Sequence, residues 1–130
     1  MNKFLQSVAS VLEVESVALD DAFRAVPDWC SLKGFGLLVM MENDWAAPLS
    51  IDRFLELKTV RDLYREAFVA FAAGVLKADR ATVASASYGS IPEWDSVAHL
   101  RLVMEAEKHF GTYYPLETIP SLKTIDDFLK

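Results

Sequence analysis

Apolar residues recur every three or four positions along most of this chain, the spacing that places them on one face of an α-helix. Between Lys3 and Val14 the recurring residues are Phe4, Leu5, Val8, Val11 and Leu12. Similar patterns predict helices over residues 31–44, 51–55 and 96–110, a short element over 116–119 and a closing helix over 124–129. No segment shows sustained apolar–polar alternation, and the small residues between Val83 and Tyr88 favour a loop over a strand. The predicted fold class is all-α.

Residues that favour helix ends support these boundaries. Ser50, Thr59 and Thr124 stand where N-caps are needed, because their hydroxyls can accept a hydrogen bond from a free backbone N–H group. Gly111 follows the helix over 96–110 and can adopt the left-handed conformation that ends many helices. The stretches 15–29 and 78–94 contain turn-forming residues and are predicted to be connections.

The two halves of the chain repeat each other at an offset of sixty-five residues. The segment PDWCSL at 27–32 matches PEWDSV at 92–97, and LKTVRDLY at 57–64 matches LKTIDDFL at 122–129. Matches at one offset near both ends of a unit indicate a tandem duplication rather than two segments that merely share a composition.

The duplication divides the chain into units 1–65 and 66–130, each near the lower size limit for an independent core. We therefore expect the two units to pack closely. No Gly-, Pro- or Ser-rich linker separates them, and residues 59–77 form one apolar-periodic segment weakened only by Gly74. Two arrangements follow from this pattern. Either the last helix of the first unit merges with the first helix of the second, or the two meet at a tight bend.

Composition and charge narrow the class of protein. The 130 residues are 52% hydrophobic and 25% charged, which is typical of a globular domain. A net charge of −6 argues against a nucleic-acid binder and favours partners with basic surfaces. The single cysteine excludes an internal disulfide, the N-terminus lacks a signal-peptide pattern, and the apolar run Phe35–Met41 is too short to span a bilayer. We expect a cytoplasmic protein without a membrane span.

The order of predicted elements in each half resembles that of the acyl carrier protein family. The resemblance rests on Asp95-Ser96-Val97, which matches the family's Asp-Ser-Leu motif, and on the helix AHLRLVMEAEKHFG that follows it. The closing LKTIDDFL is similar to the fourth helix of that family. The resemblance covers the second half and, more weakly, the first. It implies two four-helix bundles in tandem.

The resemblance also implies a chemistry. In that family the motif serine carries a 4′-phosphopantetheine arm, which a phosphopantetheinyl transferase attaches from coenzyme A, and the arm's thiol holds an acyl group as a thioester. Ser96 would be the attachment site here, between Asp95 and Val97 of the attachment motif. The cargo would be an acyl, aminoacyl or polyketide intermediate, as in fatty-acid or polyketide biosynthesis. Elementary electrostatics agrees, because a phosphodiester at a helix N-terminus faces free N–H groups and the positive end of the helix dipole.

The helix after Ser96 carries two apolar stripes. One consists of Leu102, Ala106 and Phe110, with Val103 at its edge, and is expected to face the core. The other consists of Val97, Leu100 and Met104. This second stripe either binds partner enzymes or is buried between the two halves. Acidic residues surround it: Glu93, Asp95, Glu105 and Glu107. We predict a docking surface for acyl-activating or acyl-transferring enzymes with basic surfaces, formed by Glu93, Leu100, Met104 and Glu105.

The first half departs from the motif. Ser31 aligns with Ser96, but Cys30 replaces the acidic residue, and Gly34 and Gly36 weaken the helix that follows. We therefore expect Ser31 to stay unmodified. The first half is interpreted as a degenerate carrier retained for packing or docking.

Other chemistries have weaker support. Ser96 and His99 lie three residues apart on one helix, which does not reproduce a nucleophile–base pair, and there is no G-x-S-x-G elbow. His99 is expected at the surface or boundary of the helix, too far along the chain from His109 for a local metal pair, and no metal site or catalytic residue is predicted. Cys30 is interpreted as an inert, half-buried thiol, and Trp29 and Trp94 as anchors of their loops. The remaining alternative to a carrier is an unmodified helical adaptor that acts by binding other proteins.

Overall fold

A computed structural model describes residues 2–129, and within that range it consists of helices and loops without a β-strand. The all-α prediction is therefore confirmed. The α-helices are α1 (Lys3–Leu12), α2 (Ser31–Trp45), α3 (Ile51–Glu56), α4 (Val60–Leu76), α5 (Arg80–Ser85) and α6 (Ser96–Phe110). Three short 3₁₀ helices complete the structure: η1 (Phe23–Ala25), η2 (Leu116–Ser121) and η3 (Ile125–Leu129).

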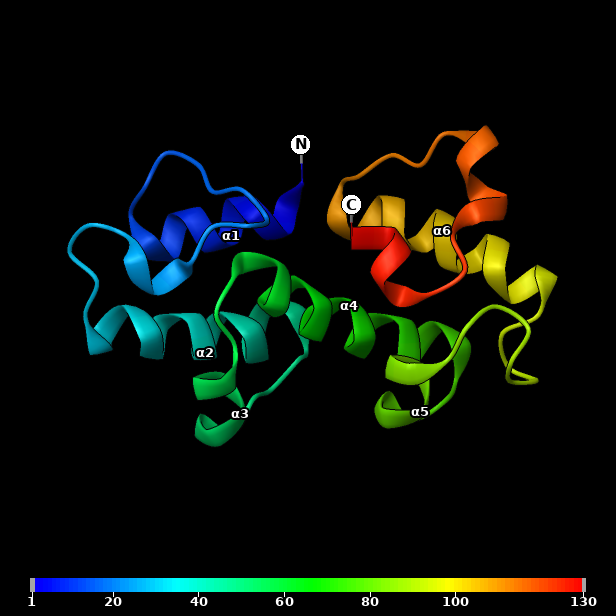
Figure 1. Ribbon diagram of the computed structural model, residues 1–130, viewed down its shortest axis with the longest axis horizontal. Helices are drawn as coiled ribbons and strands as arrows, with labels where there is room; N and C mark the ends of the chain where they lie inside the picture. Colours follow the sequence, from blue (N-terminus) through cyan, green and yellow to red (C-terminus); the bar gives the residue numbers. More distant parts are fainter. Residues whose placement is uncertain (1, 130) are drawn as a thin grey trace.

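The helix α4 connects the two halves of the molecule without interruption. It begins with a capping box, in which Thr59 accepts from the Asp62 N–H group and Asp62 accepts from the Thr59 N–H group. It ends at Lys77, which adopts the left-handed conformation. Of the two arrangements open for residues 59–77, the continuous helix is the one observed. Figure 1 shows α4 crossing the middle of the molecule, with α1, α2 and α3 towards one end and α5 and α6 towards the other.

Aromatic side chains from both halves form one hydrophobic core. Phe110 of α6 stacks on Trp45 of α2 at a centroid distance of 5.2 Å and on Phe68 of α4 at 5.3 Å. Phe4 of α1 stacks on Tyr64 of α4 at 5.2 Å. Because these rings pack against residues from both ends of the chain, the halves share a core.

The repeat in the sequence is also present in the backbone geometry. The helices α2 and α6 begin and end at positions sixty-five residues apart, as do α3 and η2. The Asp62 carboxylate accepts from the N–H groups of Lys58 and Thr59 at 2.9 and 3.0 Å. Sixty-five residues later, the Asp127 carboxylate accepts from the N–H groups of residues 123 and 124 at the same two distances. Equivalent sequences have therefore folded into equivalent turns.

Some boundaries differ from the prediction. The connection over 78–94 contains the helix α5, which Asp79 caps by accepting from the Thr82 N–H group at 2.8 Å. The sequence of α5, RATVAS, has Val83 as its one large apolar residue and so shows no helical spacing, although Asp79 is a good N-cap residue. The first helix ends at Leu12 rather than Val14, because Glu13 adopts the left-handed conformation. The closing helix is a 3₁₀ helix, η3.

Candidate functional site

Ser96 is the first residue of α6, and its side chain is exposed. The preceding residue, Asp95, has extended backbone angles and caps the helix by accepting from the Ala98 N–H group at 2.9 Å. The N–H groups of Ser96 and Val97 have no acceptor within residues 2–129. This end of α6 therefore presents a hydroxyl beside two unpaired N–H groups, an arrangement that can bind an anion.

A surface hollow of about 610 Å³ lies beside Ser96. Its lining residues come from α6, from η2 and from the loops before α6 and after η2: Tyr88, Ser96, His99, Leu100, Ile119, Pro120 and Lys123. Lys123 supplies an ammonium group, and most of the remaining wall is apolar or aromatic. The hollow thus combines a cation with a surface against which an uncharged chain can lie.

His99 holds the two walls of this hollow together. The indole N–H of Trp94 donates to His99 Nδ1 at 3.0 Å, and His99 Nε2 lies 3.2 Å from the carbonyl oxygen of Ile119. Because an indole can only donate, Nδ1 is the acceptor and Nε2 carries the proton that reaches Ile119. One ring therefore joins the loop before α6 to η2.

The prediction that His99 lies at the surface or boundary of the helix was wrong, since only 5% of the residue is exposed. Trp94, which covers it, is fully buried, as expected of a residue that anchors its loop. Helical spacing alone could not reveal this burial, because the side chain is covered by the preceding loop and η2 rather than by a neighbouring α-helix. Both ring nitrogens are engaged, so in this arrangement His99 does not serve as a base for Ser96.

The two apolar stripes of α6 have different surroundings. The stripe Leu102, Ala106 and Phe110 is buried in the core together with Val103, as predicted. The stripe Val97, Leu100 and Met104 is between 53% and 65% exposed. The alternative in which the second stripe is buried between the two halves is therefore wrong. It forms an apolar surface that begins one residue after Ser96.

The acidic residues near this stripe fall into two groups. Glu93, Asp95 and Glu105 are exposed, and Glu105 borders a shallow hollow of about 350 Å³ together with Leu100 and Met104. Glu107 is partly buried, and its carboxylate accepts from the Tyr114 N–H group at 2.9 Å. Glu107 therefore fixes the loop after α6 and is not a free surface charge.

The equivalent site in the first half has a different set of side chains. Ser31 is the first residue of α2 and is exposed, but Cys30 at the N-cap makes no side-chain hydrogen bond to the helix. Cys30 is exposed, contrary to the prediction that it is half-buried. Gly34 occupies the position of His99, and a Cβ atom there would lie 3.4 Å from the Trp29 ring. Trp29 therefore packs on a glycine where Trp94 meets a histidine.

Tertiary contacts also explain Gly36. A Cβ atom at Gly36 would lie 3.0 Å from Val11 Cγ1, so a larger residue would require the Val11 side chain to shift by a few tenths of an ångström. The two glycines that weaken α2 by propensity thus permit close packing on it.

A second hollow, of about 390 Å³, lies beside Ser31. Three of the apolar side chains that line it are largely exposed: Phe35, Ile51 and Leu55. Arg24 lies over the Phe54 ring and donates to the carbonyl oxygens of Phe54 and Leu57. These bonds connect η1 to α3. In the second half the element equivalent to α3 is η2, and His99 makes the hydrogen bond to it.

Comparison with known protein families, curated proteins and solved structures found no match to this chain. Among the described residues, no group of His, Cys, Asp and Glu side chains could hold a metal ion. None of the helices in residues 2–129 has the length and apolar character needed to cross a bilayer.

Proposed function

We propose that the protein is an acyl carrier, with a 4′-phosphopantetheine arm attached to Ser96. The observation that carries this proposal is the position of the serine. It is exposed at the capped N-terminus of α6, beside the 610 Å³ hollow and next to the exposed stripe Val97, Leu100 and Met104. The role of the protein is to present a thioester-bound acyl, aminoacyl or polyketide intermediate to other enzymes, and the protein performs no catalysis itself.

The residues around Ser96 fit a phosphodiester. The unpaired N–H groups of Ser96 and Val97 can donate to phosphate oxygens, and Lys123 in the adjoining hollow can neutralise the charge. The apolar wall formed by Leu100 and Ile119 can support the uncharged part of the arm. When attached, the arm supplies the thiol that holds the cargo.

The exposed face of α6 is the proposed docking surface. Leu100 and Met104 provide apolar contact, and Glu93 and Glu105 provide negative charge for a basic partner surface. The partners are a phosphopantetheinyl transferase and acyl-activating or acyl-transferring enzymes of the cytoplasm. Thioether groups such as that of Met104 suit a surface that must bind several partners.

In this proposal the chain consists of two carrier-like units, 1–65 and 66–130, that share α4. The first unit retains the helix order but lacks an acidic N-cap before Ser31. We propose that it is degenerate and remains unmodified.

The test is to incubate the full chain with coenzyme A and a broad-specificity phosphopantetheinyl transferase, followed by intact-mass measurement. We expect one phosphopantetheine addition, which Ser96→Ala abolishes and the matched control Ser31→Ala leaves unchanged. Two additions would show that the first unit is also active. No addition to the folded wild-type chain by several transferases would contradict the carrier function.

A second candidate function is supported by the first half. Its hollow beside Ser31 is surrounded by exposed apolar residues even though the serine lacks the acidic neighbour. This surface favours an unmodified adaptor that binds partners through both halves. If the protein is an adaptor, the wild type and Ser96→Ala should bind its partners equally well. If it is a carrier, its partner enzymes should lose turnover when they are supplied with Ser96→Ala.

A further inference from the structure

The first half carries an exposed apolar face built from two helices. On α2, Leu32, Phe35 and Val39 follow one another at helical spacing, and α3 contributes Ile51 and Leu55. These five residues form what we call the first-half face, and they are between 38% and 77% exposed. Phe35, Ile51 and Leu55 line the same 390 Å³ hollow, so the two helices contribute to one continuous surface.

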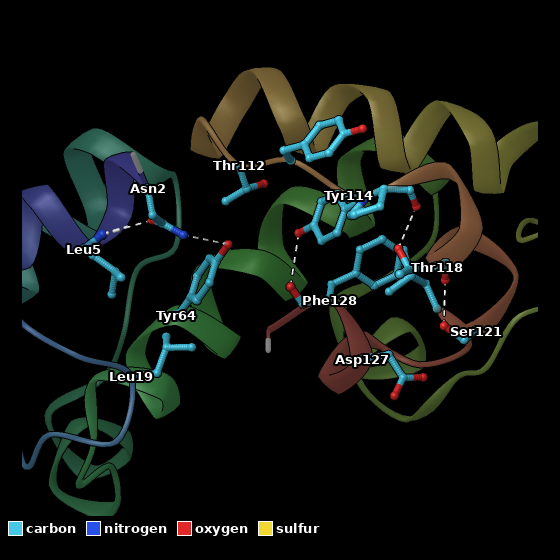
Figure 2. Close-up of a pocket in the computed structure, with 13 residues that line it drawn as sticks. Asn2, Leu5, Leu19, Tyr64, Thr112, Tyr114, Thr118, Ser121, Asp127 and Phe128 are labelled. Atoms are coloured by element: carbon cyan, nitrogen blue, oxygen red, sulfur yellow. Dashed lines mark hydrogen bonds between the residues drawn. The ribbon is translucent and has the colours of Figure 1, made fainter.

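The two halves of the chain meet on another side of the molecule. A pocket of about 440 Å³ beside Thr112 is lined by Leu5 and Leu19 from the first half and by Tyr114 and Phe128 from the second (Figure 2). In Figure 1, α2 begins at the end of the molecule farthest from α6, and α3 lies on the same side of the centre. The second half therefore leaves the first-half face open, and a cover for it has to come from another molecule.

The equivalent surface of the second half carries charges that the first-half face has lost. On α6, Asp95, Arg101 and Glu105 are exposed around the row proposed as the docking surface. Sixty-five residues earlier, these three positions hold, in order, Cys30, Gly36 and Met40. An apolar centre without charges, with an aromatic residue in it, is the composition of the core of an interface between identical subunits.

Charged groups remain at the border of the first-half face. Arg24 lines the hollow but donates to two backbone carbonyl oxygens at α3, and Arg53 of α3 forms ion pairs with Glu56 and Glu66. Three exposed acidic residues stand before the row on α2, after it, and next to Ile51: Asp28, Glu42 and Asp52. The arrangement of an apolar centre inside a charged rim matches the anatomy of a protein interface.

The face is large enough for a stable dimer. At roughly 150 Å² for a fully exposed side chain of this size, its five residues offer on the order of 500 Å² of apolar surface. Because about 65% of a homodimer interface is apolar, an interface centred here would bury roughly 800 Å² on each copy. This is about the area that each partner buries in a specific interface of standard size.

We propose that the first-half face joins two copies of this chain in a dimer with twofold symmetry. Each copy has a net charge of −6, so two copies repel each other wherever their exposed acidic residues meet. The uncharged centre of this face is where they can approach with little repulsion. The face also supplies protruding side chains, such as Leu32, and a hollow, as a surface that packs against its own copy requires.

The dimer is independent of the chemistry at Ser96. Because α6 lies towards the other end of the molecule, pairing through the first half leaves both Ser96 sites and both rows Val97, Leu100 and Met104 free (Figure 1). The proposal therefore stands whether or not Ser96 is modified. It gives the unmodified first half a role of its own, which is to bring two copies of the second half into one assembly.

The experiment measures the mass of the full chain by light scattering after size-exclusion chromatography, at concentrations from ~1 to ~100 μM. We expect twice the 14.5 kDa of one chain and a Kd at or below about 1 μM, because interfaces of this size range from μM to pM. Raising the salt concentration should preserve or strengthen the dimer, because it screens the repulsion between two acidic copies. Dissociation at high salt would contradict an apolar interface. A wild-type chain that stays monomeric at ~100 μM would overturn the proposal and leave the face to a different protein.

Equivalent substitutions in the two halves locate the interface. Phe35→Asp should weaken the dimer at least ~30-fold, the effect of losing a central aromatic contact. The matched control is Leu100→Asp at the equivalent position of α6, which should leave the dimer unchanged. Both side chains are exposed, so both variants should keep the circular dichroism spectrum of the wild type. A dimer that survives Phe35→Asp, or one that Leu100→Asp dissociates, would overturn the proposal.

NMR locates the interface without a substitution. Amide chemical shifts of the wild-type chain should differ between samples above and below the measured Kd around residues 31–39 and 51–56. Shifts of residues 96–104 should be the same in both samples. Changes confined to residues 96–104 would place the contact on α6 and would contradict the proposal even where a variant fails to fold.

Discussion

The N-termini of α2 and α6 occupy equivalent places in the fold, but their polar contacts differ. At α6, Asp95 caps the helix and His99 links Trp94 to η2. At α2, Cys30 forms no cap bond and Gly34 leaves Trp29 without such a partner. Helix geometry thus persists without the polar side chains. Their retention in the second half alone is what singles out Ser96.

The exposed apolar positions show the opposite relation, because both halves keep them. Leu32, Phe35 and Val39 of α2 occupy the positions of Val97, Leu100 and Met104 of α6, and all six are exposed. Core packing does not explain six exposed apolar side chains in two matching rows, and in the proposed function the row on α6 is the docking surface. The comparison therefore separates a surface that both halves share from a serine site that only the second half completes.

Replacing the two tryptophans should give the largest difference between the halves. Trp94→Ala should lower the free energy of unfolding by about 3–5 kcal/mol, because it empties a fully buried site and removes the partner of His99 Nδ1. Trp29→Ala should have a smaller effect, about 1–3 kcal/mol, because Trp29 is only partly buried. Urea denaturation followed by circular dichroism measures both. Equal losses would mean that the two loops are anchored alike.

Removing the histidine tests the polar link by itself. His99→Leu should lower the free energy of unfolding by about 1–3 kcal/mol, since it leaves the Trp94 N–H and the Ile119 carbonyl group without their partner. It should also increase hydrogen exchange at η2. The matched control is Lys108→Leu, on an exposed position of the same helix, where a change within about 0.5 kcal/mol is expected. Unchanged hydrogen exchange at η2 in His99→Leu would show that the hydrogen bond from His99 to Ile119 does not hold η2 in place.

Exchanging the cap residues should make the capping of the two helices more alike. Asp95→Ala should lower the free energy of unfolding by about 1 kcal/mol, because the Ala98 N–H group loses its acceptor. Cys30→Asp should raise it by a similar amount, about 1 kcal/mol, by adding a cap to α2. Thermal unfolding measures both changes. Intact-mass analysis of Cys30→Asp with the transferase then shows whether the missing cap is what keeps Ser31 unmodified, and no stabilisation would contradict the capping argument.

The smallest expected effect concerns the capping box at the N-terminus of α4, formed by Thr59 and Asp62. Burial by itself would raise the pKa of Asp62, but hydrogen bonds from the N–H groups of Lys58 and Thr59 lower it overall. A carboxylate whose pKa is lowered in the folded state stabilises the protein fully when the pH lies above its pKa in the unfolded state, about 3.9. This stabilisation is lost as the pH falls through its pKa in the folded state.

Asp62→Asn should therefore lower the free energy of unfolding by about 0.5–1 kcal/mol at pH 7. It should have little effect at a pH where the wild-type carboxyl is protonated. Denaturant titrations at pH 7 and at acid pH measure the difference between wild type and variant. A difference that stays constant or grows towards acid pH would show that the sign of the pKa shift is wrong.

Local sequence patterns determined much of the secondary structure. Helical spacing located α1, α2, α4 and α6, because a helix that buries one face must place apolar residues every three or four positions. The offset between PDWCSL and PEWDSV located the repeat, since equivalent turns need equivalent residues. The two stripes of α6 were also predicted, although their periodicity left open whether the second stripe is buried.

Only the tertiary structure decided which of these faces is covered and which polar groups are paired. His99 became a buried link because η2 and Trp94 close over it, and Glu107 became a structural acceptor because Tyr114 folds back onto it. The pocket beside Thr112 exists because the two ends of the chain meet there. Sequence spacing describes neighbours within one helix, whereas these three features depend on contacts between segments that are brought together only when the whole chain packs around α4.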